Sequence, residues 1–187
     1  SPLSGNASLG SGVAPNRIDR VLGVYKAYCT RVGSGPLPTE LHDEMGERIR
    51  EEAQEYGTTT GRPRRCGWFD GVAARYSARI NGFTGAVITR VDVFDGFPSL
   101  KVCVAYRLGD KEINYFPSSI SELEKCKPVY EELPGWQVDT TGVRTWGDLP
   151  MEARNFITRL SELIGCPVNL ACIGPERAQT IEVSPLF

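Results

Sequence analysis

The residues best suited to binding chemistry lie in one short segment, residues 58–65. Three threonines, a glycine, a proline and three arginines fall within eight positions. Arginine presents a planar fork of donors that matches a carboxylate or a phosphate, and threonine hydroxyls and the N–H groups around a glycine add further donors. The segment is therefore predicted to bind an anion, with a solvated basic turn as the alternative. Its members are Thr58, Thr59, Thr60, Gly61, Arg62, Pro63, Arg64 and Arg65.

A second candidate site lies at the end of a strand predicted over residues 86–93. Ligands of open α/β sheets bind beyond the carboxyl ends of the strands, and Asp92 stands at this end. A carboxylate there can accept two parallel hydrogen bonds from an edge that carries N–H and an amine, as guanine does, while Arg90 could lie against a base face. The alternative is that Asp92 only caps the strand end. Residues 171–175 also end a predicted strand, but alone they indicate only a turn.

Other reactive residue types are few. The only histidine, His42, is predicted to be a surface or capping residue, with a general base as the alternative. Cys66 follows two arginines, which could lower the pKa of its thiol, but structural reduced thiols are favoured for all six cysteines. One histidine and no closely spaced cysteines make a zinc site improbable. No phosphate loop, dinucleotide fingerprint or zinc-protease motif occurs.

Hydrophobic periodicity predicts the elements that must position these residues. Strands are predicted at 18–30, 86–93, 101–107, 111–116, 125–131, 168–173 and 180–183, and helices from 39 or 43 to 56, from 70 to 81, and from 148 or 150 to 164. Residues 1–16, rich in Ser, Gly and Pro, are predicted to be a loop. The order predicts an α/β fold with a mixed, largely parallel sheet flanked by helices and a small antiparallel meander.

Composition bounds the protein class. The chain has 187 residues, 41% hydrophobic and 24% charged, with a formal net charge of −2. That is an ordinary globular composition, and the charge argues against a globally basic nucleic-acid binder. No apolar run is long enough to span a membrane, and the first residues lack a secretory signal. We therefore expect a cytoplasmic protein without nucleic-acid or membrane partners.

Several long motifs resemble the adenylosuccinate synthetase family. They cover residues 24–41, 56–68, 89–96, 102–106, 130–136 and 173–177. The likeness runs through essentially the whole chain and matches the C-terminal two-fifths of the family. It implies that residues 1–187 are the C-terminal portion of a larger P-loop-NTPase-like synthetase fold, with a Gly/Ser-rich loop at 1–16, a substrate loop at 57–67 and a base-pocket half at 86–187.

The resemblance also implies an activity. The family joins IMP to L-aspartate using GTP and Mg²⁺, through a 6-phosphoryl-IMP intermediate, to give adenylosuccinate in AMP biosynthesis. Thr58 to Arg64 would then form the aspartate loop, with Arg62 reaching aspartate and the IMP ribose, Arg64 the GTP side, and Val32 touching IMP. The guanine pocket would be lined by Arg90, Val91, Asp92, Cys172, Ile173 and Gly174. The complete protein would be a homodimer.

The chain also departs from the family. It has Arg90-Val91-Asp92 where Lys-Leu-Asp is common, and Cys172-Ile173-Gly174 where Ser-Thr-Gly is common. The phosphate loop, the catalytic aspartate and the catalytic histidine have no counterpart, and His42 lies in an unrelated motif. No catalytic residue and no metal ligand is therefore expected in this chain, which alone should not turn over. The alternative is a non-catalytic, standalone guanine-nucleotide-binding or assembly module.

Overall fold

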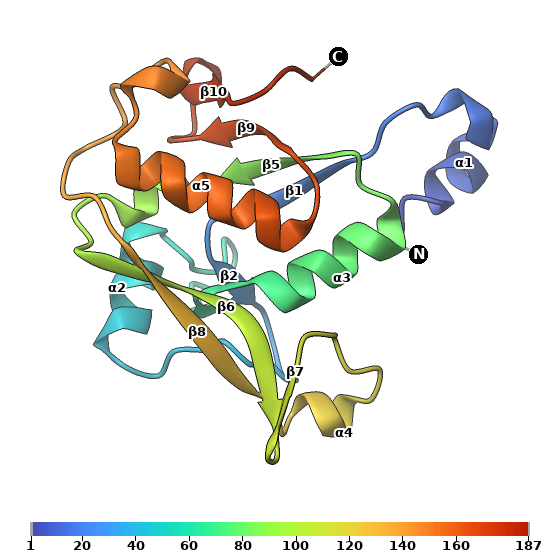
Figure 1. The fold of residues 1–187 in the computed structure, drawn as a ribbon, viewed down its shortest axis with the longest axis horizontal. Helices are drawn as coiled ribbons and strands as arrows, with labels where there is room; N and C mark the ends of the chain where they lie inside the picture. Colours follow the sequence, from blue (N-terminus) through green and yellow to red (C-terminus); the bar gives the residue numbers. More distant parts are fainter. Residues whose placement is uncertain (1, 187) are drawn as a thin grey trace.

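The main sheet has four strands (Figure 1). The computed structural model describes residues 2–186, and in it β1 (Leu22–Lys26), β5 (Gly85–Thr89) and β9 (Val168–Cys172) run parallel. The short β10 (Thr180–Glu182) pairs with β9 in the antiparallel sense. Because β1, β5 and β9 share one direction, their carboxyl ends meet at one edge of the sheet. The predicted mixed, largely parallel sheet is confirmed.

Two helices pack together on one face of this sheet, α3 (Gly71–Asn81) and α5 (Met151–Ile164) (Figure 1). The side chain of Asp70 caps α3 by accepting hydrogen bonds from the N–H groups of residues 72 and 73. The apolar stripe of α5 is fully buried against the sheet, as the periodicity predicts. Both predicted helices are confirmed.

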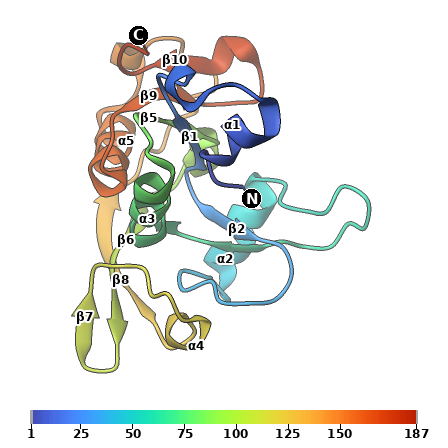
Figure 2. The same ribbon diagram turned by 90° about the vertical axis from the view of Figure 1, so that its right-hand side faces the viewer.

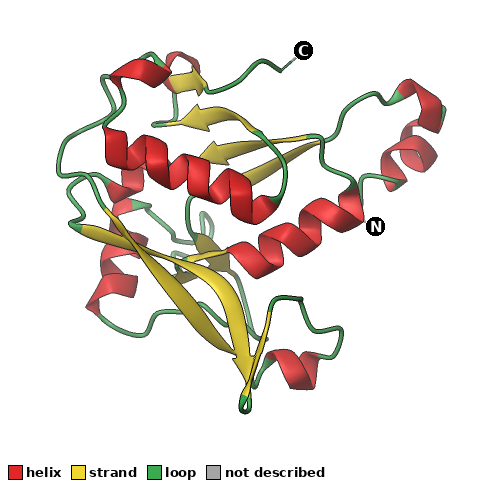
Figure 3. Ribbon diagram, viewed as in Figure 1, coloured by secondary structure: helices red, strands yellow, loops and turns green. Residues whose placement is uncertain are grey.

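A second, largely antiparallel sheet forms the lower part of the molecule (Figure 3). The long strand β6 pairs with β7 and β8 on its two sides and briefly, in parallel, with β4. The bounds are β4 (Phe69–Asp70), β6 (Ser99–Leu108), β7 (Lys111–Ile113) and β8 (Lys127–Pro134), and nearby lie α2 (Glu44–Glu52), α4 (Ile120–Leu123) and the strand pair β2 (Cys29–Arg31) with β3 (Arg65–Gly67). The predicted small antiparallel sheet is confirmed, but its strand order is not that of a meander, because β8 pairs with β6 and not with β7.

Some predicted boundaries are wrong. Residues 1–16 are not all loop, because they contain α1 (Asn6–Ser11) and lead into a 3₁₀ turn at Pro15–Arg17. This segment is held by Ser4, whose N–H donates to the side chain of Asn81 (2.8 Å) and whose hydroxyl donates to its carbonyl (2.6 Å). A tertiary contact of that kind leaves no periodicity in the sequence.

The predicted strand at 18–30 is two strands. It bends at Ala27 and Tyr28, both buried, while Val24 on β1 is 70% exposed. The predicted strand at 86–93 stops at Thr89, because Arg90 takes a left-handed conformation (φ 61°) and a 3₁₀ turn, Val91–Phe94, follows. That turn buries Val91, Val93 and Phe94 and so satisfies the apolar pattern that suggested a longer strand.

Aromatic side chains anchor the turn after β5. Phe94 packs edge-on against Phe97 (ring centroids 5.4 Å apart) and Phe156 (5.7 Å), and in a tilted arrangement against Trp68 (5.8 Å). Such pairs add stability beyond burial alone. All six cysteines are free thiols, as predicted. None of the helices within residues 2–186 has the length and apolar character needed to cross a bilayer.

Candidate functional site

The carboxyl edge of the main sheet gathers the second group of predicted site residues. β1 ends at Lys26, β5 at Thr89 and β9 at Cys172. The 3₁₀ turn after β5 contacts β9 and α2, so residues 90–92 and 172–174 lie at the same edge. Two segments that are about eighty positions apart in the sequence are therefore neighbours, as the rule for open α/β sheets predicts.

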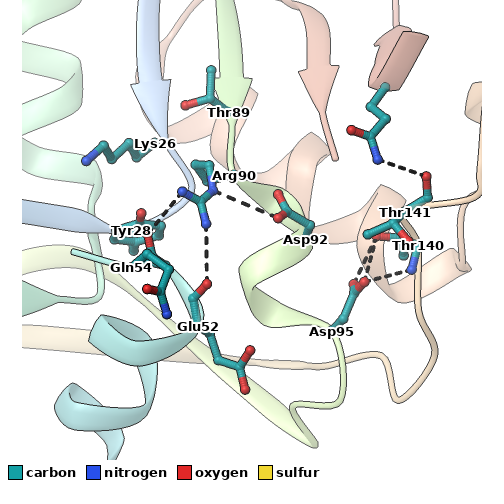
Figure 4. Close-up of polar contacts among 12 residues, drawn as sticks. Lys26, Tyr28, Glu52, Gln54, Thr89, Arg90, Asp92, Asp95, Thr140 and Thr141 are labelled. Atoms are coloured by element: carbon teal, nitrogen blue, oxygen red, sulfur yellow. Dashed lines mark hydrogen bonds and ion pairs between the residues drawn. The ribbon is translucent and has the colours of Figure 1, made fainter. Parts of the chain in front are cut away.

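Arg90 is anchored to the end of α2. Its two terminal nitrogens donate to the carbonyl oxygens of Ala53 (3.0 Å) and Glu52 (3.3 Å), and its backbone is left-handed (Figure 4). Carbonyls at a helix C-terminus have no partner within the helix, and a cation there is favourable. The contact holds the guanidinium beside Asp92, with Nε 3.9 Å from Oδ2.

One carboxylate oxygen of Asp92 accepts no hydrogen bond. Its side chain is only 17% exposed, and Oδ1 is buried with no hydrogen-bond partner. Burial raises the pKa of this carboxyl, and the positive charge of Arg90 opposes the rise. A buried acceptor without a partner is costly, and such groups occur where a ligand or an ion completes them.

Asp95 shows the contrast. Its carboxylate accepts from the indole N–H of Trp136 (2.6 Å) and from the N–H (2.7 Å) and hydroxyl of Thr140 (Figure 4). Burial raises its pKa as well, against these hydrogen bonds. Asp95 therefore fastens the segment that follows β8 to the 3₁₀ turn after β5, whereas Oδ1 of Asp92 has no partner.

The turn after β9 lies at the same carboxyl edge of the main sheet as the turn after β5. The N–H of Ile173 donates to the carbonyl of Gln179 (3.0 Å), and the side chain of Gln179 bonds Glu176 N–H (3.0 Å) and the carbonyl of Thr141 (3.2 Å). A Cβ on Gly174 would stand 2.2 Å from the amide oxygen of Gln179. Only glycine fits there while this amide keeps its place.

The predicted anion-binding segment is a projecting hairpin loop (Figure 2). Gly57 N–H donates to the carbonyl of Arg62 (2.9 Å), and Gly61, at φ 63°, donates to the carbonyl of Gly57 (2.8 Å). Residues 58–63 are all exposed. Together with residues 31–33 the loop lines a hollow of about 750 Å³, so Val32 lies beside the loop.

Arg64 differs from the rest of the loop because it turns inward. Its Nη1 donates to Oε2 of the buried Glu55 (2.7 Å), while its Nε is buried without a partner. The other carboxylate oxygen of Glu55 accepts from the hydroxyl of Tyr28 (2.6 Å) and from Lys26. Sequence reasoning missed Glu55, because one more glutamate in an acidic stretch carries no distinguishing signal.

Two alternatives from the sequence are resolved. His42 is a surface residue with its side chain 80% exposed, and the cap of α2 is Asp43, which accepts from Gly46 N–H (3.1 Å). Cys66 is buried and burial raises the pKa of its thiol, so the reactive-thiol interpretation is wrong. Among residues 2–186 no group of three or more His, Cys, Asp or Glu side chains could hold a metal ion.

Comparison with known proteins decides the family. The model of the adenylosuccinate synthetase family matches residues 1–181. The chain belongs to this family. Adenylosuccinate synthetases from Dehalococcoides mccartyi and Heliobacterium modesticaldum are 57% and 55% identical to it, over 97% and 100% of this chain. The chain spans 43% and 44% of the length of these two synthetases.

Solved structures agree with this assignment. A fully ligated adenylosuccinate synthetase from Plasmodium falciparum is 33% identical and superposes with a TM-score of 0.91, over 96% of this chain and 43% of that one. The succinoaminodeoxyadenylate synthetase of cyanophage S-2L, solved with dGMP and dATP, is 17% identical with a TM-score of 0.53, over 98% of this chain and 39% of that one. The second likeness concerns the fold alone.

Proposed function

We propose that this chain supplies the guanine pocket and the aspartate loop of an adenylosuccinate synthetase. The reaction would ligate IMP and L-aspartate, with GTP converted to GDP and phosphate. The phosphoryl group would first activate the IMP oxygen, and the aspartate amine would then displace it. The observation that carries the proposal is the unpartnered, buried Oδ1 of Asp92 at the carboxyl edge of the sheet.

The pocket suits guanine because Oδ1 of Asp92 is a buried acceptor that no donor among the described residues satisfies. A guanine edge offers N1–H and an exocyclic amine side by side, and an ionised carboxylate can accept both. Adenine presents an acceptor at N1 instead, so it would leave Asp92 unpaired. Arg90 and Val91 would frame the base, with Arg90 held in place by its contacts to α2.

Backbone groups would complete the pocket. Cys172, Ile173 and Gly174 follow β9 at the same edge, and the replacement of Ser-Thr-Gly by this triplet changes side chains rather than the turn. Gln179 fixes the turn through its contacts to residues 141 and 176. The position of the triplet therefore supports a role in holding the base through N–H and carbonyl groups.

The exposed loop would bind L-aspartate. The hydroxyls of Thr58, Thr59 and Thr60 and the N–H of Gly61 offer neutral donors, and Arg62 offers a charged fork for a carboxylate. Pro63 limits the backbone of the returning strand. Arg62 would also reach the IMP ribose, and Val32 would touch IMP. Arg64, the last residue of the aspartate loop, would fix the base of the loop on Glu55 and also face the GTP side.

The groups that perform phosphoryl transfer would come from elsewhere in the protein. Phosphoryl transfer from GTP uses Mg²⁺ to offset phosphate charge, and no cluster within residues 2–186 fits such an ion. Its ligands, the phosphate loop and the catalytic base are therefore proposed to lie outside this chain. The complete protein is proposed to be a cytoplasmic homodimer.

A turnover assay tests the proposal. The complete protein, given IMP, L-aspartate, GTP and Mg²⁺, is expected to form adenylosuccinate, while the isolated chain of residues 1–187 forms none. Absence of product with the complete protein would contradict the proposed reaction. Robust product from the isolated chain would contradict the proposal that the phosphoryl-transfer groups lie outside this chain.

A further inference from the structure

Glu55 occupies an unusual place at the base of the aspartate loop. It is 2% exposed and lies just beyond the C-terminal end of α2. Its carbonyl accepts from Arg64 N–H (2.9 Å), and its own N–H donates to the carbonyl of Arg50 (2.9 Å). Arg50 Nε in turn donates to the carbonyl of Arg64 (2.9 Å). Glu55 and Arg64 are thus the paired residues from which the projecting loop starts and to which it returns.

The carboxylate of Glu55 links its own segment to two others, the end of β1 and the end of the aspartate loop. Oε1 accepts from Lys26, at the end of β1, and from Tyr28 (2.6 Å), while Oε2 accepts from Arg64 (2.7 Å). Burial alone would raise its pKa, but the bonds from Lys26, Tyr28 and Arg64 outweigh it and hold the pKa below its usual value. An ionised, buried carboxylate is tolerated only when it is paired in this way.

Glu55 also offsets the positive charges of Lys26 and Arg64 at the base of the loop. Lys26 and Arg64 both direct cationic groups at the same carboxylate, and their side chains are each about one-third exposed. Without the negative charge of Glu55 the two cations would repel, and Arg64 would be free to turn into solvent. Nε of Arg64 is buried and has no hydrogen-bond partner, so the bond from Nη1 to Glu55 is what holds the guanidinium in place.

We propose that Glu55 is a positioning residue of the aspartate site, which fixes Arg64 and the base of the loop without contacting substrate. This inference rests on the proposed function, since it takes the loop to be the aspartate site. Glu55 connects that loop to β1, the strand next to β5 and its guanine edge. The role is independent of guanine recognition, because Asp92 and Glu55 share no hydrogen-bond partner among the described residues.

The first test is Glu55→Gln in the complete protein. The amide keeps the shape of the carboxylate but loses its charge, so the ion pair that holds Arg64 is lost. The KM for aspartate is expected to rise at least about tenfold, the equivalent of one lost charge-assisted hydrogen bond, while the GTP-over-ATP preference stays as in the wild type. Glu131→Gln, which breaks the carboxylate pair with Arg159 (2.7 Å) on β8 and α5, is the matched control and should change neither.

A double-mutant cycle separates positioning from a general loss of stability. If Glu55 acts through Arg64, then Glu55→Gln adds little to the aspartate KM of an Arg64→Gln protein. Additive effects, an unchanged aspartate KM, or a parallel loss of aspartate use and nucleotide preference would each overturn the proposal. Tyr28→Phe removes a single donor and preserves both ion pairs, so it should fold and raise the aspartate KM about threefold.

Amide hydrogen exchange distinguishes failure of this inference from failure of the proposed function. The N–H groups of Gly57, Gly61 and Arg64 are hydrogen-bonded within the loop and its base. In Glu55→Gln they are expected to exchange at least about tenfold faster than in the wild type, and in Glu131→Gln at the wild-type rate. This readout needs no turnover, so it remains decisive even if the complete protein does not ligate aspartate. Unchanged exchange would overturn the positioning role.

Discussion

Arg90 lies beside Asp92 without neutralising it. Arg90 Nε is 3.9 Å from Oδ2 of Asp92, beyond hydrogen-bond distance, and the terminal nitrogens of Arg90 are used by two carbonyls at the end of α2. Asp92 therefore remains a nearly buried acceptor with one oxygen unpartnered. The two side chains thus form a long ion pair without a hydrogen bond. A hydrogen-bonded pair would have filled the position that the guanine edge is proposed to take.

Nucleotide affinity should depend on pH through Asp92. Its pKa is raised above the ordinary value of 3.8 by burial, against the opposing charge of Arg90. Because the folded state binds the Asp92 proton more tightly than the unfolded state does, protonation of Asp92 stabilises the free protein at low pH. This stabilisation is lost as pH rises through the folded pKa. GDP binding has the opposite sign, because only the ionised carboxylate accepts both guanine donors. GDP affinity should fall about tenfold for each pH unit below the folded pKa.

Calorimetric titration of GDP at a series of pH values measures this dependence. The expected decline begins above pH 3.8, the value of an ordinary aspartate. In Asp92→Asn the profile should be flat over the same interval. An equal decline of GDP affinity in Asp92→Asn would show that another group titrates, and would contradict the prediction.

Gly174→Ala should weaken GDP binding. The new Cβ would stand 2.2 Å from the amide oxygen of Gln179. That oxygen accepts from Glu176 N–H, and the amide nitrogen of Gln179 donates to the carbonyl of Thr141. Displacing this amide loses two hydrogen bonds, each worth about 0.5–1.5 kcal/mol net. A Cβ at Gly142 has no atom within 4 Å, so Gly142→Ala is the matched control. Equal GDP affinities for the two variants would contradict the assignment of residues 172–174.

Arg62→Ala should raise the KM for aspartate. Arg62 is exposed at the tip of the loop, and no partner for its guanidinium is recorded within residues 2–186. Loss of one charged donor should cost about 1.5–3 kcal/mol of binding, roughly a 10- to 100-fold rise in KM. Steady-state kinetics of the complete protein provide the measurement, with Arg107→Ala, exposed on β6, as control. An unchanged aspartate KM would show that this loop does not hold that substrate.

Leu160→Ala should destabilise the fold without touching the site. Leu160 is fully buried on α5, between the helix and the main sheet. Truncation leaves a cavity and is expected to lower the free energy of unfolding by about 2–5 kcal/mol. Met151→Ala, 61% exposed at the start of the same helix, should change it little. Chemical denaturation compares the two variants, and similar losses would mean that α5 is not packed as described.

The sequence predicts best where burial and periodicity coincide. The stripe of α5 repeats with the period of a helix, and residues 102–106 of β6 form a short run that is apolar throughout, so the pattern alone identifies both elements. The placement of Asp92 at the carboxyl edge of the sheet was also predictable, since a carboxylate after an apolar strand is a recognisable combination. The chemistry of residues 58–65 was visible from residue types, because few loops combine three arginines with three hydroxyls.

Other features depend on contacts between distant segments. β5 ends at Thr89 because Arg90 reaches the carbonyls of α2 in a left-handed conformation, and an arginine carries no sign of positive φ. Glu55 is distinguished from the other glutamates around it only by the partners it meets in three dimensions. Local patterns describe one element at a time, so they cannot report such contacts.

The most direct test of the guanine pocket is to titrate GDP and ADP into the complete protein and into its Asp92→Asn variant. The wild type is expected to bind GDP at least about 100-fold more tightly than ADP, from two charge-assisted hydrogen bonds. Asp92→Asn should abolish the preference, while Asp110→Asn, exposed in the turn between β6 and β7, should retain it. A wild type without preference for GDP, or a preference that survives in Asp92→Asn, would contradict the account.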